Sequence, residues 1–164
     1  MRILAVVALS VSSGCSPEQT ASWPEDSSAA GIAAYLGTEA HRAAPWQAET
    51  AQPRPPADDV SPHDRVRVFF NDVLLDSQAA GNGAFEGTAH PAGAMAVKEL
   101  FDADDASLGA AVMLKIDGVA ADWVYYCDGP LEVCGVSAGS APVWGVGTDT
   151  ECGFCHGGLV FNTL

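Results

Sequence analysis

Apolar and polar residues alternate in several short stretches of the chain, which is the pattern expected of half-buried β-strands. The first is residues 65–70 (RVRVFF), and similar stretches follow at 94–101 and 108–116. A fourth, at 123–127 (WVYYC), is rich in β-prone aromatic residues and comes shortly after the turn signal Asp117-Gly118. Several strands joined by short turns predict an antiparallel sheet.

Helical patterns are confined to two short stretches. A helix is expected over about residues 28–41, with Ser27 or Ser28 as its cap, and a shorter one is expected after Asn71 or Asp72. The apolar side of the first helix would consist of Ile32, Tyr35 and Leu36. The second helix would run through Leu74, Leu75 and Gln78 and close at Gly81 and Gly83. The predicted fold class is therefore α+β, mainly antiparallel β sheet with flanking helices.

Two further segments are poor in regular patterns. Residues 45–63 carry five prolines and several acidic residues, and are expected to form a long extended connection. Glycine and proline also dominate from Cys127 to Gly147, which leads into a short closing segment.

The N-terminus has the pattern of an export signal. Arg2 supplies a positive charge, residues 3–11 are apolar, and Ser12-Ser13-Gly14 precedes Cys15. This resembles a bacterial lipoprotein signal peptide, covering residues 1–14, in which cleavage leaves Cys15 as a lipidated first residue. Residues 15–27 then read as a polar tether. The expected location is the periplasmic side of a bacterial membrane, with a lipid anchor.

The chain is strongly acidic, with a formal charge of −14 that becomes more negative when the leader with Arg2 is removed. Such a surface repels nucleic acids and anionic lipid headgroups, so neither is an expected partner. A basic redox partner would be attracted. Acidity also serves solubility, and that simpler interpretation stays open.

The sequence Cys152-Gly153-Phe154-Cys155-His156 has the C-x-x-C-H spacing of a c-type haem attachment site. Two thiols three positions apart can each add to one vinyl group of a porphyrin, and the adjacent histidine then becomes the proximal ligand of the iron. The predicted cofactor is haem c, with His156 on the metal. A zinc half-site, a redox dithiol and a disulfide are the alternatives for this cysteine pair.

Two cysteines, Cys127 and Cys134, are left over after lipid and haem take the other three. An exported protein meets an oxidising environment, which permits a disulfide between them. Two free buried thiols are the alternative.

Four segments together resemble the cytochrome P-460 family, whose relatives include the gas-binding cytochromes c′-beta. They are residues 66–72 (VRVFFND), 90–101 (HPAGAMAVKELF), 122–126 (DWVYY) and the late C-G-F-C-H with its L-V-F-N-T-L tail. The resemblance covers about residues 30–164, within the predicted haem domain at 28–164. It implies an antiparallel β fold, often dimeric, with a haem c whose distal face is open.

The resemblance also gives Lys98 a role, because hydroxylamine-oxidising members bond the lysine of V-K-E-L to the porphyrin edge. Strand alternation places Lys98 on one face with Ala94 and Ala96, small residues that leave room for a flat ring. Met95, Val97 and Phe101 would point the other way. A solvent-facing lysine is the alternative.

One feature departs from the oxidase members, which carry a distal glutamate on the strand after V-K-E-L. The corresponding stretch here, residues 110–116 (AAVMLKI), has no carboxylate. An apolar distal wall from Val112, Met113 or Leu114 suits small uncharged gases instead. Two functions therefore stay open: oxidation of hydroxylamine or a related small nitrogen compound, with electrons passing to a partner cytochrome, and binding of nitric oxide or carbon monoxide.

Plain electron transfer is a third function, and it requires a sixth ligand to the iron from the protein. The side chains that qualify in principle are His41, His63, His90, Met95 and Met113. Each is more readily explained as an ordinary polar or packing residue. The aromatic residues Trp123, Tyr125 and Tyr126 are expected to serve sheet packing.

Overall fold

The computed structural model describes residues 23–56, 61–82, 89–116, 123–136, 139 and 141–147 of the 164-residue chain. Its centre is a six-stranded sheet in which each strand pairs with its neighbour in sequence, in the order β1-β2-β3-β4-β5-β6. The strands are β1 (Gln47–Ala48), β2 (Arg65–Phe70), β3 (Met95–Phe101), β4 (Ser107–Lys115), β5 (Trp123–Cys127) and β6 (Val143–Val146). All five pairings are antiparallel, which confirms the predicted α+β fold class with a mainly antiparallel sheet.

The four strands expected from the sequence are β2 to β5, and their bounds agree with the prediction to within about one residue. The two outer strands were not predicted. β1 is only two residues long and exposed, and it lies within the proline-rich connection. β6 lies in the glycine- and proline-rich stretch and pairs with β5 along its whole length. Both outer strands depend on pairing with a neighbour more than on their own residue pattern.

The first helix, α1 (Ala29–Gly37), begins where the serine cap was predicted. Ser28 Oγ accepts a hydrogen bond from the backbone N–H of Gly31 at 3.2 Å. The helix ends four residues before His41, because Glu39 takes a left-handed conformation with φ of 56°. A short 3₁₀ turn, η1 (Ala40–Arg42), then follows.

The second helix, α2 (Asp72–Ala79), is capped by Asn71. The Asn71 side-chain oxygen accepts from the backbone N–H groups of Leu74 and Met95, both at 3.0 Å. Its amide nitrogen donates to the Gly93 carbonyl at 2.7 Å. The fully buried Asn71 therefore fixes the start of α2 to the start of β3.

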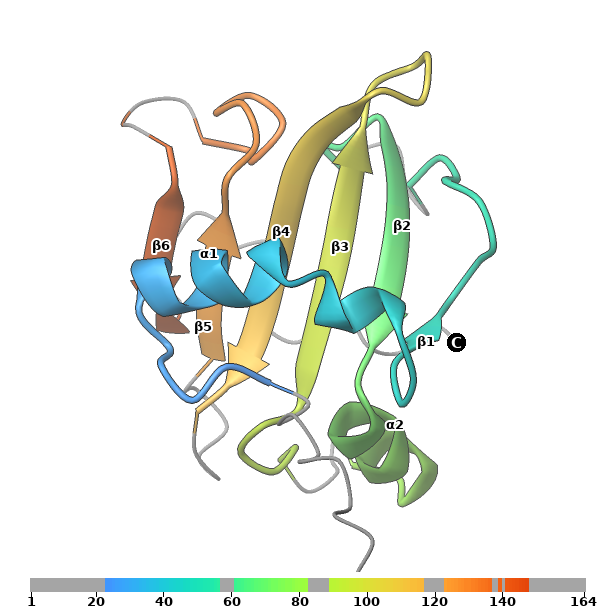
Figure 1. Cartoon of the computed structure of the whole chain (residues 1–164), viewed down its shortest axis with the longest axis vertical. Coiled ribbons are helices and arrows are strands. Elements are labelled where there is room, and N and C mark those ends of the chain that lie inside the picture. Colours follow the sequence, from blue (N-terminus) through green and yellow to red (C-terminus); the bar gives the residue numbers. More distant parts are fainter. Residues whose placement is uncertain are drawn as a thin grey trace, which may run out of the picture.

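Side chains on the sheet alternate between two faces, and α1 and η1 cross one of them (Figure 1). We call this the helix face; its core consists of Ile32, Trp46, Phe69, Met95, Val97, Val112, Leu114, Val124 and Tyr126. We call the opposite side the lysine face, because it carries Lys98. Its core consists of Val66, Val68, Phe70, Leu74, Ala94, Ala96, Leu100, Cys127, Val133 and Cys134.

Cys127 at the end of β5 and Cys134 in the following turn are joined by a disulfide, with a sulfur–sulfur distance of 1.96 Å. Both residues are buried on the lysine face. The bridge ties the turn at residues 130–136 to the sheet. Among the residues that the structure describes, no helix has both the length and the apolar character needed to cross a membrane.

Candidate functional site

The predicted haem-attachment residues Cys152, Cys155 and His156 lie outside the described residues, as does the predicted lipidation site Cys15. The described part of the candidate site is therefore the surface around Lys98. This is the one predicted cofactor contact that the sheet itself carries.

Lys98 lies in the middle of β3, between Val68 of β2 and Ala111 of β4. It is half-buried, in a strand whose next lysine-face residues, Ala96 and Leu100, are both buried. The predicted alternation is correct, because Met95 and Val97 pack on the helix face. The backbone of Lys98 therefore lies in the buried part of the sheet, and its neighbours on the lysine face include two small residues, Ala96 and Ala111.

Met113 and Tyr125 continue the lysine face across the sheet. Met113 pairs with Ala96 on one side and with Tyr125 on the other, and both side chains are buried. Val112 and Leu114, which the sequence offered as alternatives to Met113 for the apolar wall, pack instead on the helix face. The register of β4 against β3 determines which of these residues lies on the lysine face, because Met113 is paired with Ala96.

His63 lies just before β2 and is only 6% exposed, although the sequence suggested an ordinary polar residue in a linker. Its ring hydrogen-bonds to the backbone of Val133, and Nδ1 has no hydrogen-bond partner in the described part of the chain. Burial and, to a smaller extent, the nearby charge of Lys98 lower the pKa of His63 to about 4. The imidazole is therefore neutral at pH 7.

A second polar group lies at the α2 end of the lysine face, around Lys115. Lys115 is 1% exposed, and its Nζ lies 5.7 Å from the centre of the Trp123 ring. His90 contacts Ser77 Oγ through Nδ1 at 2.9 Å and packs edge-on against Trp123. Burial lowers the pKa of His90, and the charge of Lys115 adds to this effect. Two lysines and two neutral histidines thus belong to this side of the sheet.

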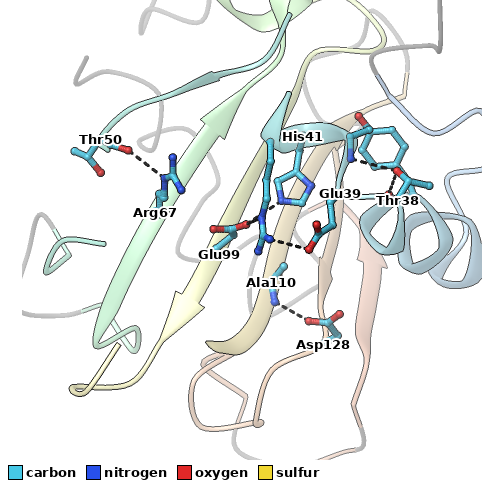
Figure 2. A network of polar contacts seen from close by, with 11 residues as sticks. Thr38, Glu39, His41, Thr50, Arg67, Glu99, Ala110 and Asp128 are labelled. Carbon is cyan, nitrogen blue, oxygen red and sulfur yellow. Dashed lines mark hydrogen bonds and ion pairs between the residues drawn. The ribbon is translucent and has the colours of Figure 1, made fainter. Parts of the chain in front are cut away.

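The helix face carries a separate polar network under η1, centred on Glu99 (Figure 2). Glu99 Oε1 lies 3.1 Å from His41 Nε2 and accepts a hydrogen bond from Arg42 Nε at 2.5 Å. Burial alone would raise the pKa of Glu99, but the hydrogen bonds and charges of His41 and Arg42 bring it below its usual value. His41 and Met95 therefore lie on the face away from Lys98, and neither can reach a ligand bound beside that lysine.

Lys98 has the small residues Ala96 and Ala111 as its neighbours on the lysine face, and the buried Met113 lies opposite Ala96. Lys98 is half-buried, whereas Lys115 is 1% exposed. Within the described ranges, no group of three or more His, Cys, Asp or Glu side chains could hold a metal ion. Lys98 and its two small neighbours are thus the features of this face that bear on the expected cofactor.

Sequence reasoning missed the burial of the histidines His41, His63 and His90 and of Lys115. Continuing the alternation of β4 from Met113 would have placed Lys115 on the same face as Lys98. No local signal marks His63, because its burial depends on the distant turn that carries Val133. Comparison with known protein families, curated proteins and solved structures finds no match to this chain.

Proposed function

We propose that this chain is an exported c-type haem protein of the cytochrome P-460 kind. The observation that carries the proposal is the spacing of Cys152, Cys155 and His156, which matches a thioether-linked haem with a histidine ligand to its iron. The late position of this motif and the V-K-E-L segment around Lys98 are the features that the chain shares with that family.

The residues of the lysine face are compatible with this proposal. A haem held by the two cysteines and His156 would meet Lys98, Ala96, Ala111 and Met113 if it packs on this face. The small side chains of Ala96 and Ala111 beside Lys98 would permit a flat group to approach the strand. Cross-linking of Lys98 to the porphyrin edge is part of the proposal.

The bound haem would supply a redox-active iron with an open coordination position for a small ligand. The proposed reaction is oxidation of hydroxylamine or a related small nitrogen compound, with electrons passing to a partner cytochrome. Buried apolar side chains such as Met113 and Tyr125 would limit the access of water to the ligand, while Lys98 orients the ring.

A second function, binding of nitric oxide or carbon monoxide without oxidation, is favoured by one specific observation. The residues of β4 on the lysine face are Gly109, Ala111, Met113 and Lys115, and none is a carboxylate that could take a proton from the substrate. In this alternative Met113 forms part of an apolar pocket for an uncharged gas.

The proposed location is the periplasmic side of a bacterial membrane, with residues 1–14 removed, Cys15 lipidated and residues 15–27 serving as a tether. The strong negative charge favours a basic redox partner over nucleic acid.

The test is the intact mass and absorption spectrum of the protein produced with a cytochrome c maturation system. We expect one covalently bound haem, which is lost when Cys152 and Cys155 are both replaced by serine. The matched control replaces Cys127 and Cys134 by serine, which removes two cysteines but leaves the motif in place. A wild-type protein with the mass of the bare polypeptide overturns the proposal.

A further inference from the structure

We propose that the α2 end of the sheet is the surface that this protein turns toward the membrane. A short lipid anchor holds the loop at residues 89–93, together with Ile116, next to the headgroups of the bilayer that carries the lipid of Cys15. This inference rests on the proposed function, because it requires the proposed lipidation, and it adds the surface and the orientation.

The first support is the place where the chain enters the folded domain. Trp23 packs so closely on Gly93 that a Cβ atom at Gly93 would lie 2.8 Å from Trp23 Cε2. Gly93 also has a positive φ of 85°, so this contact with the indole favours glycine. The Gly93 carbonyl accepts a hydrogen bond at 2.7 Å from the side chain of Asn71, the residue that caps α2. The chain therefore joins the domain at the α2 end of β3 (Figure 1).

The second support is that residues 23–27 are held to the domain by further contacts. Asp26 packs on Gly31 of α1, where a Cβ atom would lie 2.6 Å from the Asp26 side chain. The carbonyl of Ser27 accepts a hydrogen bond from the indole N–H of Trp144 in β6 at 3.0 Å. These residues therefore add no length to the connection between the domain and the lipid.

The third support is the short reach of that connection. Residues 16–22 are all that separates Cys15 from Trp23. A chain of about eight peptide units reaches at most about 28 Å, and a flexible chain of this length has a mean end-to-end distance of about 15 Å. The nine residues of β4 alone span about 30 Å. The β3–β4 hairpin, at the other end of the sheet, therefore lies farther from the bilayer than the α2 end does.

The fourth support is the chemistry of the surface beside Trp23. The loop at residues 89–93 (AHPAG) has no Asp, Glu, Lys or Arg, although the chain carries a net charge of −14. Ile116 is 39% exposed, and it follows Lys115, whose carbonyl accepts from the Gly93 N–H at 2.8 Å. Uncharged side chains can approach lipid headgroups without the cost of desolvating a carboxylate. This part of the α2 end is therefore suited to face the bilayer.

Acidic residues of the same end limit how strongly this surface can bind lipid by itself. Glu25 follows the anchor point closely, Asp76 belongs to α2, and both are exposed. With the net charge of the chain, they oppose attachment to anionic headgroups. The short anchor, and not attraction by the surface, therefore sets the orientation.

The experiment uses the full-length, lipidated and haem-loaded protein in vesicles of phosphatidylcholine and phosphatidylglycerol. Ile116→p-benzoylphenylalanine is compared with Ala103→p-benzoylphenylalanine, a change at an exposed position of the β3–β4 hairpin, and lipid adducts formed on irradiation are measured by mass spectrometry. We expect at least about five times more adduct at position 116, because the two positions are about 25 Å apart along β4. Ala92→p-benzoylphenylalanine, in the loop, is a second reporter of the α2 end and should behave like the Ile116 variant.

The matched control is a protein with about 20 glycine and serine residues inserted after Thr20, which keeps every contact of the folded domain but has about twice the mean reach. We expect its adduct ratio to fall below about twofold, because the domain can then rotate.

Equal adduct yields at both ends of the lipidated protein overturn the inference and leave the proposed location intact. An unchanged ratio in the lengthened protein also overturns it, since the anchor would then not set the orientation. A mature protein whose mass shows no lipid on Cys15 contradicts the proposed location itself, and the inference falls with it.

Discussion

Lys98 and Glu99 are consecutive residues of β3 whose side chains reach opposite faces of the sheet, each into a polar group of its own. Lys98 lies on the face of His63, and Glu99 is held by His41 and Arg42 under η1. The contacts of Glu99 therefore hold β3 on the helix face, at the point from which Lys98 extends on the opposite face.

The first prediction concerns Lys98. If this lysine is bonded to the porphyrin, the ferrous wild-type protein has a Soret band far to the red of ordinary c-type haem, and Lys98→Ala shifts it back. Absorption spectra and intact masses of the two proteins check this. Arg67→Ala is the control, because Arg67 lies on the next strand and stacks over Phe69 on the helix face. Identical spectra for wild type and Lys98→Ala would mean that no cross-link exists.

The second prediction tests the proposed function by placing a carboxylate on the lysine face of β4. Met113 is the buried β4 residue on the lysine face, diagonal to Lys98 across the β3–β4 pair. We expect Met113→Glu to raise the rate of hydroxylamine oxidation by at least tenfold, since a positioned base contributes about 10²–10⁴-fold. Steady-state kinetics with an artificial electron acceptor measure it. Met113→Gln has the same shape without the base, and an equal gain in that variant would rule out proton transfer as the cause.

The third prediction concerns the disulfide between Cys127 and Cys134, which are seven residues apart. Closing so short a loop restricts the unfolded chain modestly, so replacing both cysteines by serine should cost about 2–3 kcal/mol. Urea denaturation of oxidised wild type and the double variant checks this value. Reduced wild type should lose a similar amount, and an unchanged midpoint on reduction would contradict the prediction. We also expect the variant to shift the His63 ¹⁵N signals, because the turn that carries Val133 is no longer tied to β5.

The central strands and the face of Lys98 could be predicted because they depend on local alternation. β2 alternates between polar and apolar residues, and β5 is rich in β-prone aromatic residues. The separation of Lys98 from Met95 and Val97 follows from the two-residue period of a strand. The edge strands could not be predicted, since β1 and β6 are short and are defined by pairing with β2 and β5.

The parts of the site that sequence could not supply are those made by contacts between distant segments. Which of Val112, Met113 and Leu114 belongs to the lysine face follows from the register of β4 against β3, not from the composition of β4. His63 contacts a turn that lies about 70 residues later in the chain, and the residues next to His63 in the sequence do not predict its burial.

The fourth prediction concerns Glu99, which is buried between His41 and the half-exposed Arg42. At pH 7 we expect Glu99→Gln to lower the free energy of unfolding by about 1–3 kcal/mol, because charge-assisted hydrogen bonds are replaced by weaker ones. Glu39→Gln is the control: Glu39 also pairs with Arg42, at 2.7 Å, but it is largely exposed and should matter little.

The pH dependence of this difference has a definite sign. Hydrogen bonds and charges hold the pKa of Glu99 in the folded protein below its ordinary value of 4.5, despite the opposing effect of burial. The stabilisation from Glu99 is therefore fully present above about pH 4.5 and is lost as the pH falls through the lower pKa of the folded state. Urea denaturation should show that the difference in free energy of unfolding between wild type and Glu99→Gln is smaller at pH 3 than at pH 7. A gap that is constant or wider at pH 3 would mean that the folded protein does not favour the ionised carboxylate.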